Sequence, residues 1–368
     1  MIEKVKLQDI ASFSKGQQIN GDELIENGQY EYLNGGVNPS GHWKEFNING
    51  NTVTISEGGN SCGYINYMNF PFWCGAHCYY LYDLKIGSKY LYYALKSQQE
   101  KIMKLRSGAC MPNIKKSDLG NFELIINTDV NIQNQTVLIL ENISYLIDKR
   151  KQQLEKLDEL IKSRFVEMFG TLELPAEEFD KETLKNLCVK ITDGKHGGCT
   201  FEVGTERYFV GAREIYDDAI HYETAPEIDV AEFEKDYKRC NMEIGDFLIV
   251  NTGATIGKSA IATDSRTNHT LLQKSVALLK VKKKLLNPIF LKFCYKVNDK
   301  MYRVTGASAQ PNLLLSRINA TEIYVPPIEF QNQFADFVKQ VETSKAEIQK
   351  GLDKLELLKK ALMQKYFG

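Results

Sequence analysis

The residues that come nearest to a catalytic motif form a glycine-rich segment in the second half of the chain. Residues 253–259 read Gly-Ala-Thr-Ile-Gly-Lys-Ser. A nucleotide-binding Walker loop needs one more residue between its glycines than the three that separate Gly253 from Gly257. We therefore predict a tight turn, whose backbone N–H groups and Lys258 can face a phosphate group.

Two enzyme classes, an amino-methyltransferase and a nuclease, were weighed against the residues. A methyltransferase would need Asn/Asp-Pro-Pro-Tyr/Phe, and residues 287–290 (Asn-Pro-Ile-Phe) lack the second proline. A helix start explains them better, because Asn caps a helix and Pro suits its first turn. A nuclease would need clustered carboxylates and a lysine around Mg²⁺. The only candidates, residues 83–85 and 232–235, do not recur, so we predict no catalytic residue.

The cysteines favour neither a disulfide framework nor a metal centre. Eight cysteines are scattered over the 368 residues, which is typical of reduced thiols in a reducing compartment. The closest pair, Cys74 and Cys78, flanks Gly-Ala-His, but no second Cys/His pair follows at the spacing of zinc ligands. We expect buried thiols and no metal.

An internal repeat of domain size indicates the architecture. In the first copy Pro-Asn at 112–113 is followed by Gln-Asn-Gln at 133–135 and Phe-Gly at 169–170. The second copy repeats these elements at 311–312, 331–333 and 367–368. The chain is long enough for two domains that each have a core.

The repeat predicts an α+β fold in which two mixed α/β domains are each followed by a long helix. We place the domains at residues 1–130 and 171–328, and the helices at residues 131–170 and 329–368. The two copies resemble each other at Leu7–Ile10 and Leu184–Leu187, and at Ile55–Gly58 and Val250–Gly253. Strands are expected at 30–33, 51–55, 208–210, 247–250 and 275–281, and helices at 88–105 and 288–298.

The long helices carry a heptad pattern, with seam residues at alternating steps of three and four. Polar residues interrupt the seam at Arg150 and Arg164 in the first helix, and at Lys345 and Lys359 in the second. The offset favours pairing of the two different helices. We predict an antiparallel intramolecular coiled coil of about 55 Å that relates the two domains by pseudo-twofold symmetry. The length of this coiled coil would set the spacing of two DNA segments. The seams are Leu140, Ile143, Ile147, Arg150, Leu154, Leu157, Ile161, Arg164 and Met168, and Val338, Val341, Lys345, Ile348, Leu352, Leu355, Lys359, Leu362 and Tyr366.

Charge is distributed unevenly although the net charge is only −1. Residues 85–116 hold eight Lys/Arg and one acidic residue, and residues 258–303 hold eleven and two. Both basic segments precede a Pro-Asn dipeptide. This matching position favours contact with nucleic acid.

The chain resembles the specificity subunit of type I restriction-modification systems over essentially its full length. The resemblance rests on the doubled Pro-Asn, on residues 326–333 (Pro-Pro-Ile-Glu-Phe-Gln-Asn-Gln) and on the Lys-Leu…Phe-Gly helix ends. Residues 193–196 also resemble the Asp-Gly-x-His loop of target recognition domains in this family. Residues 127–130 depart from the family, because they lack its proline-rich entry to the first helix.

The resemblance implies a subunit without chemistry of its own. Each target recognition domain would read one half of a split double-stranded DNA target. The helices would dock methyltransferase subunits, expected to be two, and through them the restriction subunits. S-adenosylmethionine, ATP and Mg²⁺ are expected on these partners, and no cofactor on this chain.

Polar and basic residues of the predicted loops are the candidates for reading DNA. His196 stands out because glycines bound its loop. Asn113 and Asn312, in contrast, should turn the backbone and not contact DNA. The candidates are Lys15, Gln17, Gln18, Asn34, Ser56, Asn60, Lys104 and Arg106 in the first domain, and Lys195, His196, Arg213, Asn251, Thr252 and Lys258 in the second.

Two further expectations concern partners and location. A coiled-coil scaffold that binds only proteins would explain the seams but not the paired basic segments. No stretch is apolar enough for a membrane span or a signal peptide, so we expect a cytoplasmic protein with no membrane partner.

Overall fold

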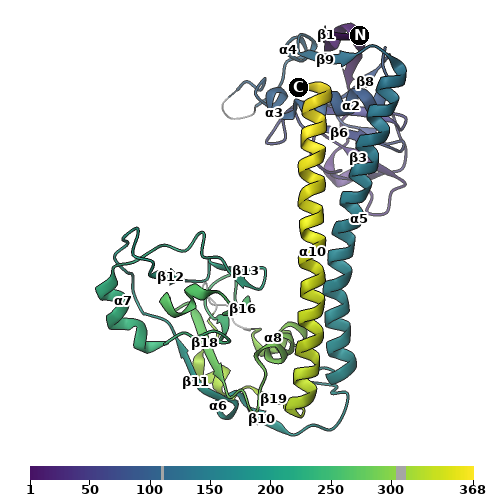
Figure 1. The fold of residues 1–368 in the computed structure, drawn as a ribbon. Coiled ribbons are helices and arrows are strands. Elements are labelled where there is room, and N and C mark those ends of the chain that lie inside the picture. Colours follow the sequence, from purple (N-terminus) through teal and green to yellow (C-terminus); the bar gives the residue numbers. More distant parts are fainter. Residues whose placement is uncertain (109–111, 304–311) are drawn as a thin grey trace. The chain divides into compact units, whose positions relative to one another are not determined.

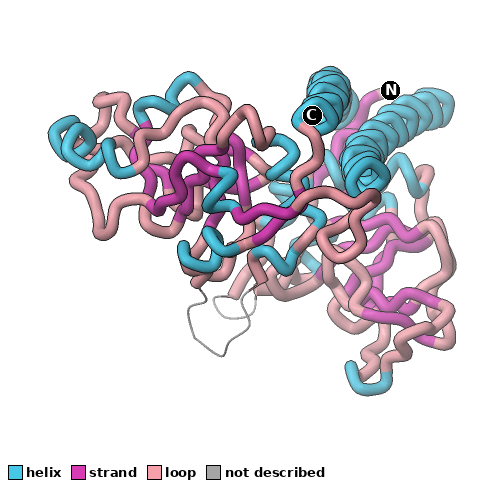
Figure 2. Tube along the Cα trace, turned by 90° about the horizontal axis from the view of Figure 1, so that it is seen from below, coloured by secondary structure: helices cyan, strands magenta, loops and turns pink. Residues whose placement is uncertain are grey.

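The computed structural model in Figure 1 describes residues 1–108, 112–303 and 312–368. Pro311 of the second Pro-Asn dipeptide therefore lies outside the described residues. The chain divides into unit 1 (residues 1–152 and 348–368) and unit 2 (residues 153–347). Each unit combines short strands with helices and long loops, which Figure 2 draws in magenta, cyan and pink. The fold is α+β, as the sequence predicts.

Unit 1 is built around a four-stranded antiparallel sheet with strand order β2-β8-β5-β6. Beside it, β3 pairs antiparallel with β4 and parallel with β7, and β1 pairs with β9. The elements are β1 (Ile2–Lys6), α1 (Leu7–Ile10), β2 (Ser12–Lys15), η1 (Gly21–Glu23), β3 (Tyr30–Leu33), β4 (Gly41–Trp43), β5 (Thr52–Ser56), β6 (Ile65–Met68), β7 (Trp73–Cys74), β8 (Cys78–Tyr82), α2 (Ser88–Ser97), α3 (Gln99–Met103), α4 (Lys116–Gly120) and β9 (Glu123–Asn127).

Unit 2 repeats this plan with a sheet in the order β11-β18-β15-β16, a parallel pair β12-β17 and an outer pair β10-β19. The β13-β14 hairpin and α7 have no counterpart in unit 1. The elements are β10 (Lys181–Thr183), α6 (Leu184–Leu187), β11 (Cys188–Asp193), β12 (Tyr208–Val210), β13 (Ile215–Tyr216), β14 (Ala219–Ile220), α7 (Val230–Asp236), η2 (Tyr237–Arg239), β15 (Phe247–Val250), β16 (Ser259–Ile261), η3 (Ser265–His269), β17 (Thr270–Leu272), β18 (Val276–Val281), α8 (Pro288–Val297), η4 (Asp299–Met301), α9 (Leu315–Ala320) and β19 (Glu322–Tyr324).

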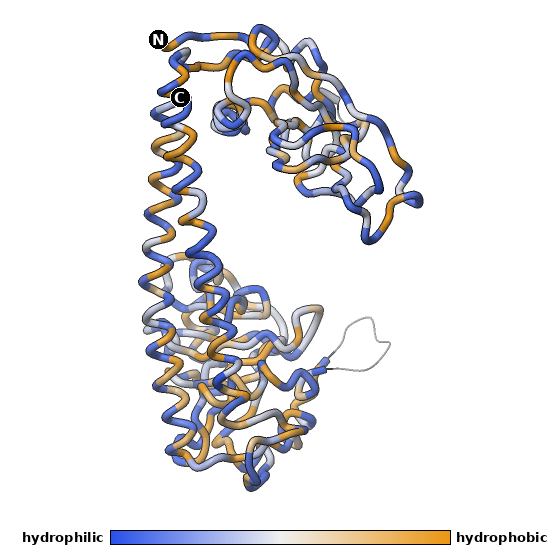
Figure 3. Tube along the Cα trace, turned by 90° about the vertical axis from the view of Figure 1, so that its right-hand side faces the viewer, coloured by the Kyte–Doolittle hydropathy of each residue, from blue (hydrophilic) through white to orange (hydrophobic). Residues whose placement is uncertain are grey.

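The two long helices, α5 (Val130–Phe169) and α10 (Ile328–Phe367), pack against each other in both units. In unit 1 the Lys151 ammonium lies 3.1 Å from Glu356, and in unit 2 Lys345 lies 2.7 Å from Asp158. Residue numbers fall along α10 as they rise along α5, so the pairing is antiparallel. Figure 3 shows apolar and polar residues alternating along both helices.

The predicted seam is correct over most of its length. Leu140, Ile143, Ile147 and Ile161 of α5 are buried, as are Val338, Val341 and Leu352 of α10. The half-buried Lys345 interrupts the second seam at the predicted place.

The prediction is wrong at the end of α5. Arg164 is exposed and pairs with Glu167, while Phe165 and Phe169 take the buried positions. The Phe165 ring lies 5.5 Å from Phe290 and 5.3 Å from Phe334, between centroids. An aromatic cluster of this kind gains more from burial than an arginine at the seam would.

Most of the shorter elements agree with the sequence. The strands at 30–33, 208–210 and 247–250 match as predicted, and the Asn287 side chain caps α8 by accepting from the Ile289 N–H. The helix expected over 88–105 is instead two helices, because Gln98 leaves the helical backbone with φ −103° and ψ 16°. In the described part of the chain, no helix is long and apolar enough to cross a membrane.

Candidate nucleic-acid interface

The predicted reading residues gather at one end of the four-stranded sheet in each unit. There β2 and β5 of unit 1 end and β8 begins, and β11, β15 and β18 of unit 2 are arranged in the same way. We call these ends the loop edges. The loop edge of unit 1 comprises residues 15–18, 34–35, 56–61, 75–77 and 113, and that of unit 2 comprises residues 193–196, 211, 250–255, 273–275 and 312.

A shared set of backbone hydrogen bonds holds both loop edges. The Glu57 N–H donates to His77 at 2.8 Å, and its carbonyl accepts from Ile114 at 2.9 Å. The Asn251 N–H donates to Ser275 at 2.9 Å, and its carbonyl accepts from Leu313 at 2.7 Å. Glu57 and Asn251 therefore occupy matched positions.

This match corrects the repeat alignment. The sequence paired Ile55–Gly58 with Val250–Gly253, which is wrong by one residue. Gly63 donates to the Ser56 carbonyl and Gly257 to that of Val250, so Ser56 corresponds to Val250. The pairing of Leu7–Ile10 with Leu184–Leu187 is confirmed, because these residues form α1 and α6.

The first loop of each edge is matched as well. Gln17 donates its N–H to Cys74 at 2.8 Å, and Lys195 donates to Leu272 at 2.7 Å. A Cβ on the preceding glycine, Gly16 or Gly194, would collide with the same carbonyl group. Both loops therefore require glycine for a close approach of two backbones. Lys15 and Asp193, the last residues of β2 and β11, stand at equivalent places.

At one pair of facing positions, the side chain and the glycine change places between the two units. Asn34 follows β3 and lies over Gly75, whereas in unit 2 Gln273 lies over Gly211. A Cβ at either glycine would meet the facing amide.

In unit 1 a buried carboxylate lies at the centre of the loop edge. Glu57 accepts from the Lys15 ammonium at 2.7 Å, and its other oxygen lies 3.4 Å from His77 Nδ1. The Asn34 amide donates to Gln18 at 3.2 Å and accepts from the His77 N–H at 3.1 Å. The structure thus brings together Lys15, Gln18 and Asn34. Ser56 is buried beside them and donates to the Gly35 carbonyl.

In unit 2 the carboxylate is Asp193 at the end of β11, whereas in unit 1 it is Glu57, which follows β5. Asp193 binds the Arg239 guanidinium and lies 3.2 Å from His196 Nε2. Arg239 is fixed further by donating from Nε to the carbonyls of Asp193 (3.0 Å) and Gly194 (2.8 Å). A cavity of about 510 Å³ opens beside this group and is lined by Asp193, His196, Asn251, Thr252, Lys274, Asn312, Leu314, Leu315 and Ser316.

Lys195 is not presented to solvent as the sequence suggested. Its ammonium lies 2.8 Å from Asp236 and 3.0 Å from Glu232. The hydrogen bond that Lys195 donates to Asp236 raises the pKa of Lys195, and the hydrogen bonds from Thr200 and Lys195 lower the pKa of Glu232 to about 2. This network ties the loop after β11 to α7.

The remaining predicted residues lie on the loops around the two edges. Gln17, Asn60, Lys104, Arg106, Arg213 and Lys258 are exposed. Asn251 is buried to 3% exposure yet lines the cavity of unit 2. Asn113 pairs its backbone with Ser107, as its predicted structural role requires. Asn312 accepts from Thr252 Oγ1 at 3.3 Å, and its exposed side chain also lines the cavity.

Part of the charge of the two basic segments is bound in ion pairs. Lys292 and Lys296 of α8 both bind Asp218, and Lys280 lies 2.9 Å from Asp246. Lys89 likewise binds Glu141 in unit 1. Several of the charges counted in the sequence are therefore neutralised inside the fold.

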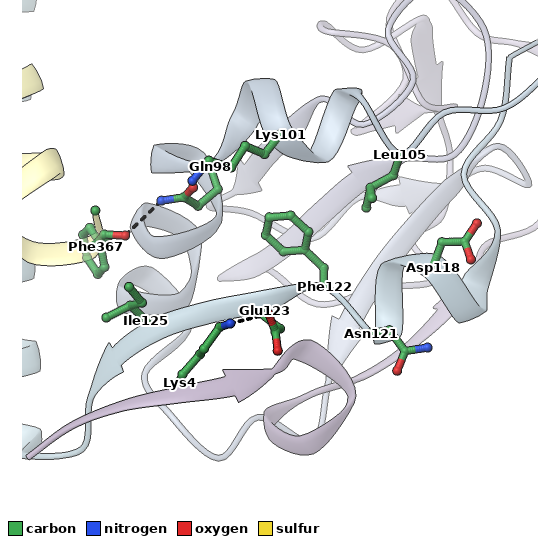
Figure 4. A pocket seen from close by; sticks show the side chains of 11 residues that line it. Lys4, Gln98, Lys101, Leu105, Asp118, Asn121, Phe122, Glu123, Ile125 and Phe367 are labelled. Atoms are coloured by element: carbon green, nitrogen blue, oxygen red, sulfur yellow. Dashed lines mark hydrogen bonds and ion pairs between the residues drawn. The ribbon is translucent and has the colours of Figure 1, made fainter.

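Another cavity of unit 1, of about 610 Å³, lies beside β1, β9 and the end of α10 (Figure 4). Lys4 pairs with Glu123 at 2.6 Å, and Gln98 Nε2 donates to the Phe367 carbonyl at 2.9 Å. These polar groups engage one another and do not converge on the cavity. Among the described residues, no group of three or more His, Cys, Asp or Glu could hold a metal ion.

Sequence reasoning missed Glu57, His77, Asp193 and Arg239 as members of the two edges. A carboxylate is not expected among DNA contacts, and His77 lay within the segment weighed as a zinc site. Only the Asp-Gly-x-His pattern gave a signal for Asp193.

Comparisons with known proteins agree with this arrangement. The family profile described as "Type I restriction modification DNA specificity domain" matches residues 2–159 and 178–357. A Mycoplasma genitalium protein named as a type I specificity subunit is 26% identical over 376 residues, which cover 99% of this chain and 93% of that protein. A Mycoplasma pneumoniae protein named in the same way is 38% identical over 161 residues, or 43% of this chain and 41% of that protein.

Two solved structures share the fold. The crystal structure of the S subunit of a type I restriction-modification system from M. genitalium matches with a TM-score of 0.66 and 22% identity, over 100% of this chain and 96% of that chain. A chain from a structure described as explaining complex assembly and conformational transition of the type I system matches with a TM-score of 0.61 and 12% identity. That match covers 99% of this chain and 97% of the other.

The two units repeat one scaffold and carry matched loop edges. The chain belongs to the type I restriction-modification DNA specificity family. It is the DNA specificity subunit of such a system, and in this family the cofactors reside on the methyltransferase and restriction subunits.

Proposed function

We propose that the chain reads a bipartite DNA target, one half through the loop edge of unit 1 and the other through that of unit 2. The observation that carries this proposal is the shared backbone frame, in which the same hydrogen bonds present Glu57 in one unit and Asn251 in the other. A rigid frame with different side chains suits two readers of different sequences.

The proposed contacts are exposed or partly exposed side chains together with Asn251, which is buried but lines the cavity of unit 2. Base edges are read by Lys15, Gln18, His196 and Asn251, and Arg106 and Lys258 bind phosphates. Two candidates act indirectly, because Ser56 and Lys195 hold their loops through bonds within the protein. The other proposed contacts are Gln17, Asn34, Asn60, Lys104, Arg213 and Thr252.

The paired helices are proposed to dock two methyltransferase subunits, and through them the restriction subunits. This is supported by apolar residues that are exposed at matching places of the two helices, Leu160 of α5 in unit 2 and Leu358 of α10 in unit 1. Exposed apolar residues on a repeated element suit a partner that binds twice. We place this assembly in the cytoplasm, where DNA is accessible.

The proposal is tested by exchanging one domain. We take residues 1–130 and 171–328 as the target recognition domains and α5 and α10 as the spacers. Residues 171–328 are replaced by the matching domain of a relative with another target, and the chain is assembled with its methyltransferase. Methylation mapping should show one half-target changed and the other kept. A change in both halves, or in neither, would reject reading by separate units.

A further inference from the structure

Each loop edge contains a carboxylate of low exposure that holds an exposed histidine and an exposed cation. In unit 1 the side chain of Glu57 is 11% exposed, against 62% for His77 and 44% for Lys15. In unit 2 that of Asp193 is 14% exposed, against 63% for His196 and 44% for Arg239. The three chemical roles and their exposures agree between the units.

The two clusters are similar although their residues do not occupy equivalent positions in the two units. Lys15 and Asp193 occupy the same place at the end of the first sheet strand, so the charge there is inverted. Glu57 and Asn251 are also matched, so the position that holds the carboxylate in unit 1 holds an amide in unit 2. Each unit therefore builds the same cluster from different strands, which indicates that the cluster itself is required.

We propose that Lys15–Glu57–His77 and Arg239–Asp193–His196 are the base-reading centres of the two half-targets, and that each binds the major-groove edge of a guanine. The cation donates to guanine O6 and N7, and the histidine is placed beside it. Glu57 and Asp193 are positioning residues. This inference rests on the proposed function, because it requires that each unit reads its own half-target.

The carboxylate favours a base edge over a phosphate. It neutralises the neighbouring cation, so the cluster has little net charge with which to attract a phosphate. A guanine edge is uncharged and offers two acceptors, which lysine and arginine recognise more often than any other base edge.

Donors remain for this contact after the internal bonds are made. The Lys15 ammonium has three protons and uses one for Glu57. Arg239 uses Nε and one Nη2 proton for Asp193 and Gly194, which leaves the Nη1 amino group. These donors are fixed before DNA arrives, so little side-chain entropy is lost on binding.

The test uses the full chain assembled with its methyltransferase subunits and DNA in which each base pair of the target is varied singly. Glu57→Gln should lower discrimination at one G·C pair of one half-target on the order of ten-fold, and Asp193→Asn at one G·C pair of the other. The remaining pairs should be read as before. Glu123→Gln and Asp299→Asn, which remove exposed carboxylates from ion pairs elsewhere in units 1 and 2, are the matched controls.

Two further variants keep the inference falsifiable if a buried change prevents assembly. His77→Ala and His196→Ala remove exposed side chains and should relax the same base pairs as the carboxylate variants. A uniform loss of methylation over a half-target would instead indicate phosphate contact or a structural role, and would overturn the inference. A wild-type chain without a bipartite target would reject the proposed function itself. A bipartite target read unchanged by all four variants would reject only the reading centres.

Discussion

The loop edges of unit 1 and unit 2 share their backbone hydrogen bonds but not their side chains. The end of the first sheet strand carries Lys15 in one unit and Asp193 in the other, and the residue after β5 or β15 is Glu57 or Asn251. The backbone frame is therefore separable from the chemistry it presents. Variation can accumulate at these positions without disturbing the sheet, which suits a protein whose family must recognise many DNA sequences.

The largest expected difference between the units lies in the helix ends. Phe165 packs among Phe169, Phe290 and Phe334, whereas its counterpart in unit 1, Met363, is only half-buried. Phe165→Ala should lower the free energy of unfolding of unit 2 by about 4 kcal/mol. Met363→Ala should lower the free energy of unfolding of unit 1 by clearly less. Denaturant unfolding with hydrogen exchange resolved by unit measures both, and equal losses would show that the two helix ends are packed alike.

The glycine loops should respond in the same way in both units. A Cβ at Gly16 or Gly194 meets a backbone carbonyl, so Ala at either position should destabilise its own unit by about 2 kcal/mol. Gly21→Ala and Gly198→Ala are the controls, because a Cβ at these glycines meets nothing within 4 Å. Thermal unfolding of the four variants is the measurement. A loss in only one unit would mean that the frame is not equally tight in both.

The lysines on α8 should make unit 2 sensitive to acid. Burial opposes the charge of Asp218, but Lys292 and Lys296 outweigh it and lower its pKa. A carboxyl whose pKa is lowered in the folded state stabilises the fold at pH values above its pKa in the unfolded state. This contribution is lost as the pH falls through the pKa of the folded state. Asp218→Asn should therefore destabilise unit 2 by about 1 kcal/mol at pH 7 and less near pH 3. Urea unfolding at several pH values tests this, and an unchanged pH dependence would exclude the ion pairs as its cause.

Unit 1 should show its own pH dependence, at alkaline pH. Lys96, which corresponds to Lys296 on the matched helix, bonds the Ile65 carbonyl and lies over the Tyr64 ring instead of pairing with a carboxylate. Burial, followed by the charge of Lys359, lowers the pKa of Lys96 to about 8. The unfolded state then binds more protons between about pH 8 and 10, so stability should rise over this range. Lys96→Met should abolish the rise, as measured by chemical unfolding. A rise that persists would assign it to another group.

Patterns that repeat were readable from the sequence, and contacts between distant residues were not. The doubled Pro-Asn and the heptad steps predicted two units and their helices, because periodicity is local. The fate of Lys195 depended on Asp236, far along the chain, and no spacing rule predicts that pairing. The ion pairs of Asp218 and Asp246 with lysines of the second basic segment were not readable for the same reason.

The loop register was missed for a different reason. Residues 55–58 and 250–253 look alike in composition, but the alignment is fixed by the hydrogen bonds of Ser56 and Val250 to Gly63 and Gly257. A shift of one residue turns every side chain to the opposite face of a strand. The sequence alignment therefore matched Ser56 with Asn251, although Glu57 occupies that position in unit 1.

The exchange of side chain and glycine between Asn34–Gly75 and Gln273–Gly211 has a consequence for how new target specificities arise. Copying Gln273 into the place of Gly75 would bring two amides into the volume of one, and removing Asn34 alone would leave that volume empty. The two positions must therefore change together. Random single substitutions would rarely pass this barrier, whereas recombination of whole loops or domains moves both residues at once.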